Sequence, residues 1–130
     1  MKSYSLRIAY IIFFLSLTLS ACSENRSGAV NAIQSYLQAL VNKDTEQIST
    51  LACAAWEADA RTELESMTAV TVSLQDLKCQ EAGTDGDVTL VSCSGKIVAN
   101  YGNEVLEIDL SERTYQAVYE AGEWRMCGYR

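Results

Sequence analysis

This 130-residue chain contains no histidine. The side chains left that could do chemistry are those of five cysteines, seven tyrosines and 17 aspartates and glutamates. Without histidine, the Ser-His and Cys-His pairs of nucleophilic catalysis are excluded, and the most common general base and metal ligand are missing. Two carboxylates flank Gly86 in an expected turn, whereas a calcium loop needs many converging oxygens. Four more carboxylates lie along one expected helix, a pattern that is typical of a helix face exposed to solvent. These four are Glu57, Asp59, Glu63 and Glu65. We therefore predict no metal site and no cofactor.

The first 21 residues have the parts of an export signal. Lys2 and Arg7 give a positive start, and residues 8–19 form an apolar run. The run is too short to span a hydrocarbon core about 30 Å thick, so cleavage is the better interpretation. It ends in the sequence LSAC at residues 19–22. This sequence resembles the lipobox of bacterial lipoproteins, in which a branched apolar residue and two small residues precede the cysteine that is lipidated.

The lipobox resemblance implies that Cys22 becomes the first residue of the mature chain, with a diacylglyceryl thioether and usually an N-acyl group such as palmitate. Two or three acyl chains hold a protein stably at a bilayer. Ser23 follows, where Asp would favour the inner membrane, so the family rule indicates the outer membrane if the source has one. The expected plan is a signal peptide over residues 1–21, a lipidated tether over 22–27 and one domain over 28–130. The alternative is a secreted protein cleaved near Ala21.

The expected mature chain is acidic. Its 109 residues are enough for one domain with its own core. Without Lys2 and Arg7 it has 8 basic and 17 acidic residues, a net charge of −9. We expect no nucleic-acid partner, because phosphate contacts need clustered Lys and Arg. The expected partner is a membrane, through the lipid, in an extracytoplasmic compartment.

Four cysteines besides Cys22 remain in the expected exported domain. An even number in an oxidising compartment predicts two disulfides. Of the three pairings we favour Cys79–Cys93, which joins consecutive expected strands, and Cys53–Cys127, which joins a helix to the last strand. The rival interpretation is a four-thiolate zinc site, but the spacings contain no C-x-x-C knuckle.

The register of one expected hairpin argues against the first pair. A tight two-residue turn at Asp85 and Gly86 would place Cys79 opposite Ser92 and put the two cysteines on opposite faces. The Cys79–Cys93 pair therefore requires a longer loop centred on Gly86.

The periodicity of apolar residues predicts three helices followed by strands. Asp44 with Gln47 resembles a capping box at the start of the second helix. The helices are expected over residues 27–42, 44–53 and 55–67, and the strands over 70–80, 88–99, 105–119 (bent near 111–113) and 124–129. The predicted fold class is α+β: three N-terminal helices packed on a curved four-stranded antiparallel meander sheet.

Two stretches resemble the nuclear-transport-factor-2-like (NTF2-like, or cystatin-like) superfamily, the cone-shaped fold of ketosteroid isomerase and scytalone dehydratase. VNAIQSYLQALVNKDTEQISTLA at residues 30–52 is similar to the family's opening, in which one helix ends at a polar break containing Asp and a second follows. EWRMCGY at residues 123–129 is similar to the family's last strand. The resemblance covers residues 28–130 and implies a space between the helices and the sheet.

The isomerase motif is matched in one part of three. Tyr36 matches the tyrosine that donates to the enolate oxygen in ketosteroid isomerase. The isomerase also needs an Asp base on a strand and a protonated Asp in an apolar site. Asp59 lies on a helix instead, and alternation turns Asp109 away from its apolar neighbours. We therefore predict no catalytic residues, with an enzyme that uses Tyr36 as the alternative.

Aromatic residues are the candidates to line a pocket between helices and sheet: Tyr36, Trp56, Tyr115 and Trp124. Tyr101, Tyr119 and Tyr129 are aromatic enough to line it too, and packing in the core is the alternative for the aromatic residues on strands. We expect a lipid-anchored extracytoplasmic binding or interaction domain without catalytic machinery. Its partner besides the membrane would be a second copy of the chain, another envelope protein or an unidentified small molecule. The alternatives are a small-molecule enzyme of ketosteroid-isomerase type and a structural or stress lipoprotein of the envelope.

Overall fold

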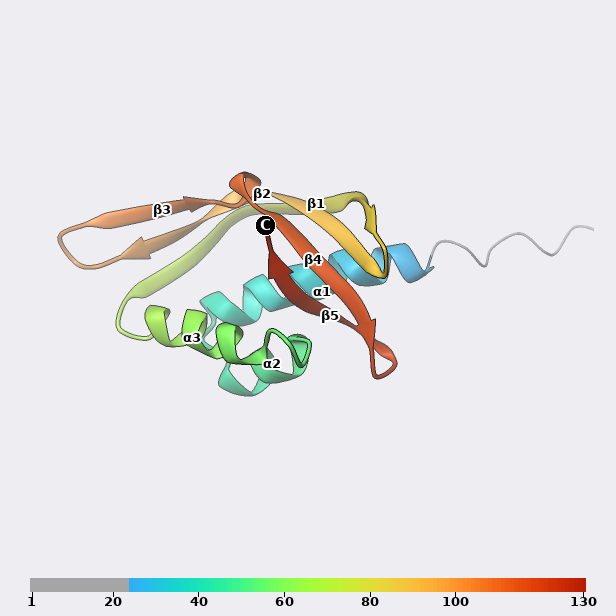
Figure 1. The fold of residues 1–130 in the computed structure, drawn as a ribbon. Coiled ribbons are helices and arrows are strands. Elements are labelled where there is room, and N and C mark those ends of the chain that lie inside the picture. Colours follow the sequence, from blue (N-terminus) through green and yellow to red (C-terminus); the bar gives the residue numbers. More distant parts are fainter. Residues whose placement is uncertain (1–23) are drawn as a thin grey trace, which may run out of the picture.

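The computed structural model describes residues 24–130, so the predicted signal peptide and Cys22 lie outside the described residues. Three helices come first and a sheet follows, which confirms the predicted fold class (Figure 1). The helices are α1 (Glu24–Val41), α2 (Thr45–Leu51) and α3 (Glu57–Met67). The strands are β1 (Thr71–Asp85), β2 (Val88–Asn100), β3 (Val105–Asp109), β4 (Thr114–Glu120) and β5 (Glu123–Tyr129), with a 3₁₀ turn, η2 (Leu110–Glu112), between β3 and β4.

The sheet is antiparallel, with strand order β1-β2-β4-β5. β4 pairs with the N-terminal half of β2, and β3 pairs with its C-terminal half. The single strand expected over residues 105–119 is therefore two strands, which makes five in place of four. The turn η2 separates them because Leu110 turns into the core and is fully buried. Asp109 caps this turn by accepting hydrogen bonds from the N–H and Oγ of Ser111 at 2.9 and 2.6 Å.

Cys79 and Cys93 lie directly opposite each other on β1 and β2, with their sulfurs 2.03 Å apart. The prediction that this pair requires a longer loop is wrong. The hairpin turn is tight, with Asp85 paired to Val88. Instead, an extra residue on β1, Ala82, forms a β-bulge that shifts the register by one and brings the two cysteines onto the same face.

The second cysteine pair, Cys53 and Cys127, has its sulfurs 1.98 Å apart and joins the segment between α2 and α3 to β5. The backbone supports the same junction. Ala52 forms a bridge to Met126, and the N–H of Cys53 donates to the carbonyl of Met126 at 2.8 Å. The start of α3 is therefore held against the last strand.

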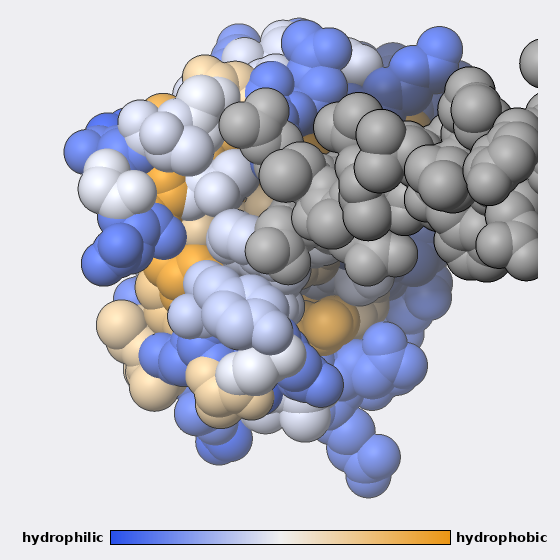
Figure 2. All heavy atoms as spheres, turned by 90° about the vertical axis from the view of Figure 1, so that its right-hand side faces the viewer, coloured by the Kyte–Doolittle hydropathy of each residue, from blue (hydrophilic) through white to orange (hydrophobic). Residues whose placement is uncertain are grey.

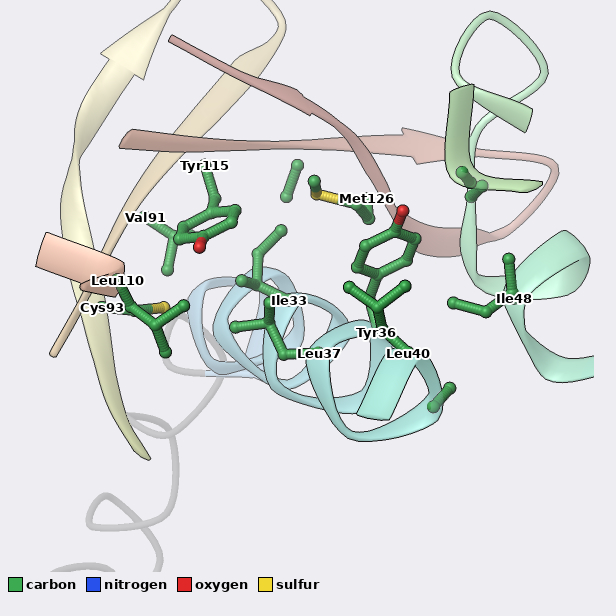
Figure 3. Close-up of a cluster of buried hydrophobic side chains, with 14 of the residues drawn as sticks. Ile33, Tyr36, Leu37, Leu40, Ile48, Val91, Cys93, Leu110, Tyr115 and Met126 are labelled. Carbon is green, nitrogen blue, oxygen red and sulfur yellow. The ribbon is translucent and has the colours of Figure 1, made fainter. Parts of the chain in front are cut away.

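The core lies between α1 and the concave face of the sheet. Figure 3 shows Ile33 and Leu37 of α1 directed towards side chains from the sheet, among them Tyr115 and Val91. These four side chains are at most 2% exposed. Burial of such a side chain stabilises the fold by roughly 1.5–3 kcal/mol.

The start of α2 follows the sequence prediction. Asp44 is its N-cap and accepts a hydrogen bond from the N–H of Gln47 at 3.0 Å, which confirms the capping interaction. The preceding residue, Lys43, has a positive φ of 59° and donates from Nζ to the carbonyl of Val70 at 2.6 Å. The end of α1 is therefore tied to the entry into β1.

The visible surface beside the start of α1 is mostly hydrophilic, and its strongly apolar residues lie in separate small areas (Figure 2). Scattered exposed apolar residues are ordinary on a protein surface. Within residues 24–130, no helix is both long and apolar enough to cross a membrane.

We predict that Gly95→Ala destabilises the sheet. Gly95 has a φ of +103°, and a Cβ there would lie 2.4 Å from the carbonyl oxygen of Gln75 and 2.7 Å from that of Asp76. The strained φ costs about 1–3 kcal/mol and the overlap with backbone about 1–3 kcal/mol more. Gly102→Ala is the matched control, because φ there is +93° but nothing lies within 4 Å. Urea unfolding should show a clearly larger loss for Gly95→Ala, and equal losses would contradict the packing described.

Candidate functional site

A cluster of polar side chains between the helices and the sheet is centred on Glu63 of α3. Its Oε2 accepts a hydrogen bond from Tyr36 and its Oε1 accepts one from Tyr129, both at 2.8 Å. The indole N–H of Trp56 donates to the hydroxyl of Tyr36 at 3.3 Å. Arg113 lies with Nη1 4.0 Å from Oε1 of Glu63. Two phenols and one guanidinium thus stabilise a carboxylate whose side chain is only 20% exposed.

Tyr129 reaches this cluster because β5 contains a bulge near its end. The extra residue breaks the alternation, so Met126 and Tyr129 both face the helices. Gly128, at the bulge, has a φ of +102°, and a Cβ there would lie 3.2 Å from the ring of Trp56. Trp56 meets the edge of Tyr129 with ring centroids 5.5 Å apart.

A cavity of about 150 Å³ lies next to this cluster. Its apolar wall comes from α1, α3 and the sheet: Leu37, Leu40, Met67, Ile97, Ile108 and Met126. Its polar wall consists of Tyr36, Glu63, Ser66, Arg113, Tyr115 and Tyr129. The least buried of these residues belong to α3 and to the β3–β4 junction, so the cavity opens between those two elements.

The hydroxyl of Tyr115 is a buried donor without a partner. The residue is 1% exposed, and no described residue accepts the proton of its hydroxyl, because the guanidinium of Arg113 beside it can only donate. Burial raises the pKa of Tyr115 to about 12, although the charge of Arg113 acts in the opposite direction. The phenol is therefore protonated at neutral pH. Leaving such a group unsatisfied costs about 1–3 kcal/mol, and an acceptor atom in the cavity would remove that cost.

The other two phenols are already engaged. Burial, and then the neighbouring charge of Glu63, raise the pKa of Tyr36 far above its ordinary value. Burial and the hydrogen bond to Glu63 likewise raise the pKa of Tyr129. Both hydroxyls are protonated and direct their protons at Glu63. Arg113 also lies over the ring of Tyr129, with Cζ 4.2 Å from the centroid.

The structure brings some of the predicted pocket residues together. Tyr36 and Tyr115 line the cavity, and Trp56 lies behind Tyr36 as its hydrogen-bond donor. Trp124 does not line the cavity. It lies at the opposite end of β5, where its ring packs against Gly28 of α1 and the edge of Tyr119.

The assignment of Glu63 to a solvated helix face is wrong. Asp59 and Glu65 of that series are exposed and Glu57 is half-exposed and paired with Arg61, but Glu63 lies inside. Ala60, Glu63, Leu64 and Met67 follow the i, i+3, i+4, i+7 spacing of an inward face, which is the sequence signal that could have found it. Arg113 was also missed, because a 3₁₀ turn sets its direction. Tyr129 was among the aromatic candidates and does line the cavity, but its contact with Glu63 depends on a bulge that the sequence pattern does not show.

The other carboxylates considered from the sequence have structural partners or face solvent. Asp109 is exposed and caps η2, and Asp59 is exposed on α3. Asp85 accepts two hydrogen bonds from Arg130, each 3.0 Å long. In the part of the chain that the structure describes, no three metal-ligating side chains come together.

Known structures share this fold. An NTF2-like family protein of Streptomyces avermitilis, named as a candidate dehydratase, matches with a TM-score of 0.57 at 15% identity, over 81% of this chain and 92% of that one. An NTF2-like protein with a cystatin-like fold from Novosphingobium aromaticivorans matches with a TM-score of 0.52 at 13% identity, over 97% and 86%. No protein-family model and no curated protein matches the sequence. The chain thus has the NTF2-like fold that its sequence resembled.

We predict that Tyr115→Phe does not destabilise the protein at pH 7 and raises its free energy of unfolding by up to about 1 kcal/mol, because an unsatisfied hydroxyl is removed. The effect depends on pH. The tyrosine ionises near pH 10 in the unfolded chain but near 12 in the folded one, so the wild type loses stability as the pH rises between these values. The variant should lose about 1–3 kcal/mol less over that range. Urea unfolding at pH 8, 10 and 11.5 measures this, and parallel curves would contradict it.

Proposed function

We propose that this protein is an extracytoplasmic binding module, held at a membrane through lipid on Cys22, that takes a small neutral molecule into the cavity beside Glu63. The unpartnered hydroxyl of Tyr115 on the cavity wall is the observation that carries the ligand proposal. Every other phenol at the cavity already donates to Glu63. Tyr115 is therefore the phenol of the cavity that is left to donate to a ligand.

The cavity sets the size of this ligand. An engineered cavity of about 150 Å³ in another protein binds benzene, so a compound with one six-membered ring is the expected size. The walls formed by Leu37, Leu40, Ile97 and Met126 suit an apolar body. The hydroxyl of Tyr115 suits one acceptor atom, such as a carbonyl, ether or alcohol oxygen.

The charges at the cavity favour a neutral ligand. Glu63 is negative and Arg113 positive, and they lie 4.0 Å apart. An added carboxylate would meet Glu63, and an added ammonium would meet Arg113. A charged ligand of either sign would lose its hydration on entering the cavity, and this desolvation costs free energy. It would gain little in return, because the charges of Glu63 and Arg113 already offset each other.

An isomerase-type enzyme is the second candidate, since a carboxylate and a phenol do lie together at the cavity. The hydrogen bonds argue for binding without turnover. The proton of Tyr36 is directed at Glu63, and both oxygens of Glu63 already accept phenol protons. A cavity suited to one ring also has no room for the four fused rings of a steroid.

Ligand binding can be tested with cyclohexanone, using cyclohexanecarboxylate and cyclohexylamine as charged analogues of similar size. We expect cyclohexanone to raise the melting temperature of the full-length protein and the charged analogues to raise it less. Tyr115→Phe should weaken cyclohexanone binding about tenfold, which corresponds to about 1.4 kcal/mol for one hydrogen bond. Tyr119→Phe is the control, because Tyr119 is 61% exposed and lies outside the cavity. Equal affinity of the wild type and Tyr115→Phe would refute this binding mode.

The anchor has a separate test. The lipobox resemblance supports lipidation, and the two disulfides suit an oxidising compartment. We expect the wild type in the membrane fraction and Cys22→Ala in the soluble fraction or uncleaved. Mass spectrometry of the N-terminal peptide should show a diacylglyceryl group on Cys22. An unmodified sulfur there would remove the lipid anchor from the proposal while leaving the cavity test intact.

A further inference from the structure

Most of the large apolar side chains exposed in the described part of the chain lie in one hairpin. Four such residues are exposed, and three of them belong to the hairpin of β2 and β3: Tyr101 (51%), Val105 (57%) and Leu106 (48%). Figure 1 shows this hairpin projecting beyond the helices. We call residues 96–109 the wing. A cluster of exposed apolar residues indicates an interaction site more often than scattered ones do.

The wing also presents a free strand edge. β3 pairs with β2 on one side, and no described strand pairs with its other side. At the tip, the N–H of Tyr101 donates to the carbonyl of Glu104 at 2.8 Å. Because hydrogen-bonded and non-hydrogen-bonded pairs alternate along antiparallel strands, Val105, Glu107 and Asp109 direct their N–H and C=O groups away from β2.

The two faces of this edge differ in chemistry. Leu106 and Ile108 share the inner face with Ala99 and Ile97, their partners on β2. Val105, Glu107 and Asp109 share the outer face. A strand added to this edge would therefore meet apolar side chains on one face, and Val105 with two carboxylates on the other.

The charge of the wing indicates whether a second copy of β3 or a strand of another protein would pair with this edge. The wing contains three carboxylates, Glu104, Glu107 and Asp109, and one amine, Lys96, whose Nζ lies 2.7 Å from Glu107. Pairing of two β3 strands would bring four carboxylates together, Glu107 and Asp109 from each copy, and like charges opposite each other destabilise a sheet. A basic strand would instead complement the outer face.

We propose that β3 accepts an extended segment of a partner protein in which basic and apolar residues alternate. The backbone of that segment bonds to the groups of Val105 and Glu107 that face outward, as in β-strand addition. Its apolar side chains extend the row of Leu106 and Ile108, and its Lys or Arg side chains lie beside Glu107 and Asp109. The wing is thus a docking site for a basic protein segment, separate from the cavity ligand.

The probe for this test is the synthetic peptide KVKVKVK, compared with EVEVEVE, and binding to the full-length protein is measured by fluorescence anisotropy and by amide chemical shifts. We expect the basic peptide alone to bind and to shift the amides of Val105 and Glu107. Glu107→Lys should weaken binding at least about tenfold. Glu46→Lys is the matched control, since it makes the same charge change on α2.

A second variant separates backbone pairing from charge. Val105→Pro removes an outward N–H without removing a carboxylate, and it should also weaken binding. Circular dichroism checks that each variant is folded. Equal weakening by Glu46→Lys and Glu107→Lys would mean nonspecific charge attraction and would overturn the proposal. Absence of peptide binding, or a wild-type dimer that buries the wing, would overturn it too.

Discussion

The carboxylate of Glu63 is the interaction on which the space between helices and sheet depends. It joins α3 to α1 through Tyr36 and to β5 through Tyr129, and each hydrogen bond spans at least 27 residues of sequence. A largely buried carboxylate is costly unless it is paired, so these phenols and Arg113 must stay in place for the charge to be tolerated. The same requirement fixes the width of the cavity, because its polar wall consists largely of these side chains.

The fold was predictable because its signals are local. The apolar spacing of α1, the Asp44 cap and the change from helical to strand periodicity each depend on a few neighbouring residues. The cysteine pairing was reached correctly from strand order, but the longer loop that it was expected to require was wrong. A bulge at Ala82, and not a long loop, aligns Cys79 with Cys93. A one-residue insertion of this kind leaves little trace in an alternating pattern.

The site was less predictable because it is assembled by irregularities. Tyr129 faces inward owing to the bulge at Gly128, and Arg113 leaves a 3₁₀ turn that divides an expected continuous strand. Glu63 could have been found from its position on the inner stripe of α3. Its charge argued for solvent, and only tertiary hydrogen bonds from distant tyrosines outweigh that preference.

The position of the Cys53–Cys127 pair has a consequence for when this architecture is complete. Cys53 begins the short segment that leads to Trp56, and the disulfide joins this segment to Cys127 of β5. Trp56 in turn contacts both Tyr36 and Tyr129. While those thiols are reduced, no covalent bond keeps that tryptophan beside β5. A newly made chain in a reducing compartment would therefore have a looser polar wall, and oxidation would be the step that matures the pocket.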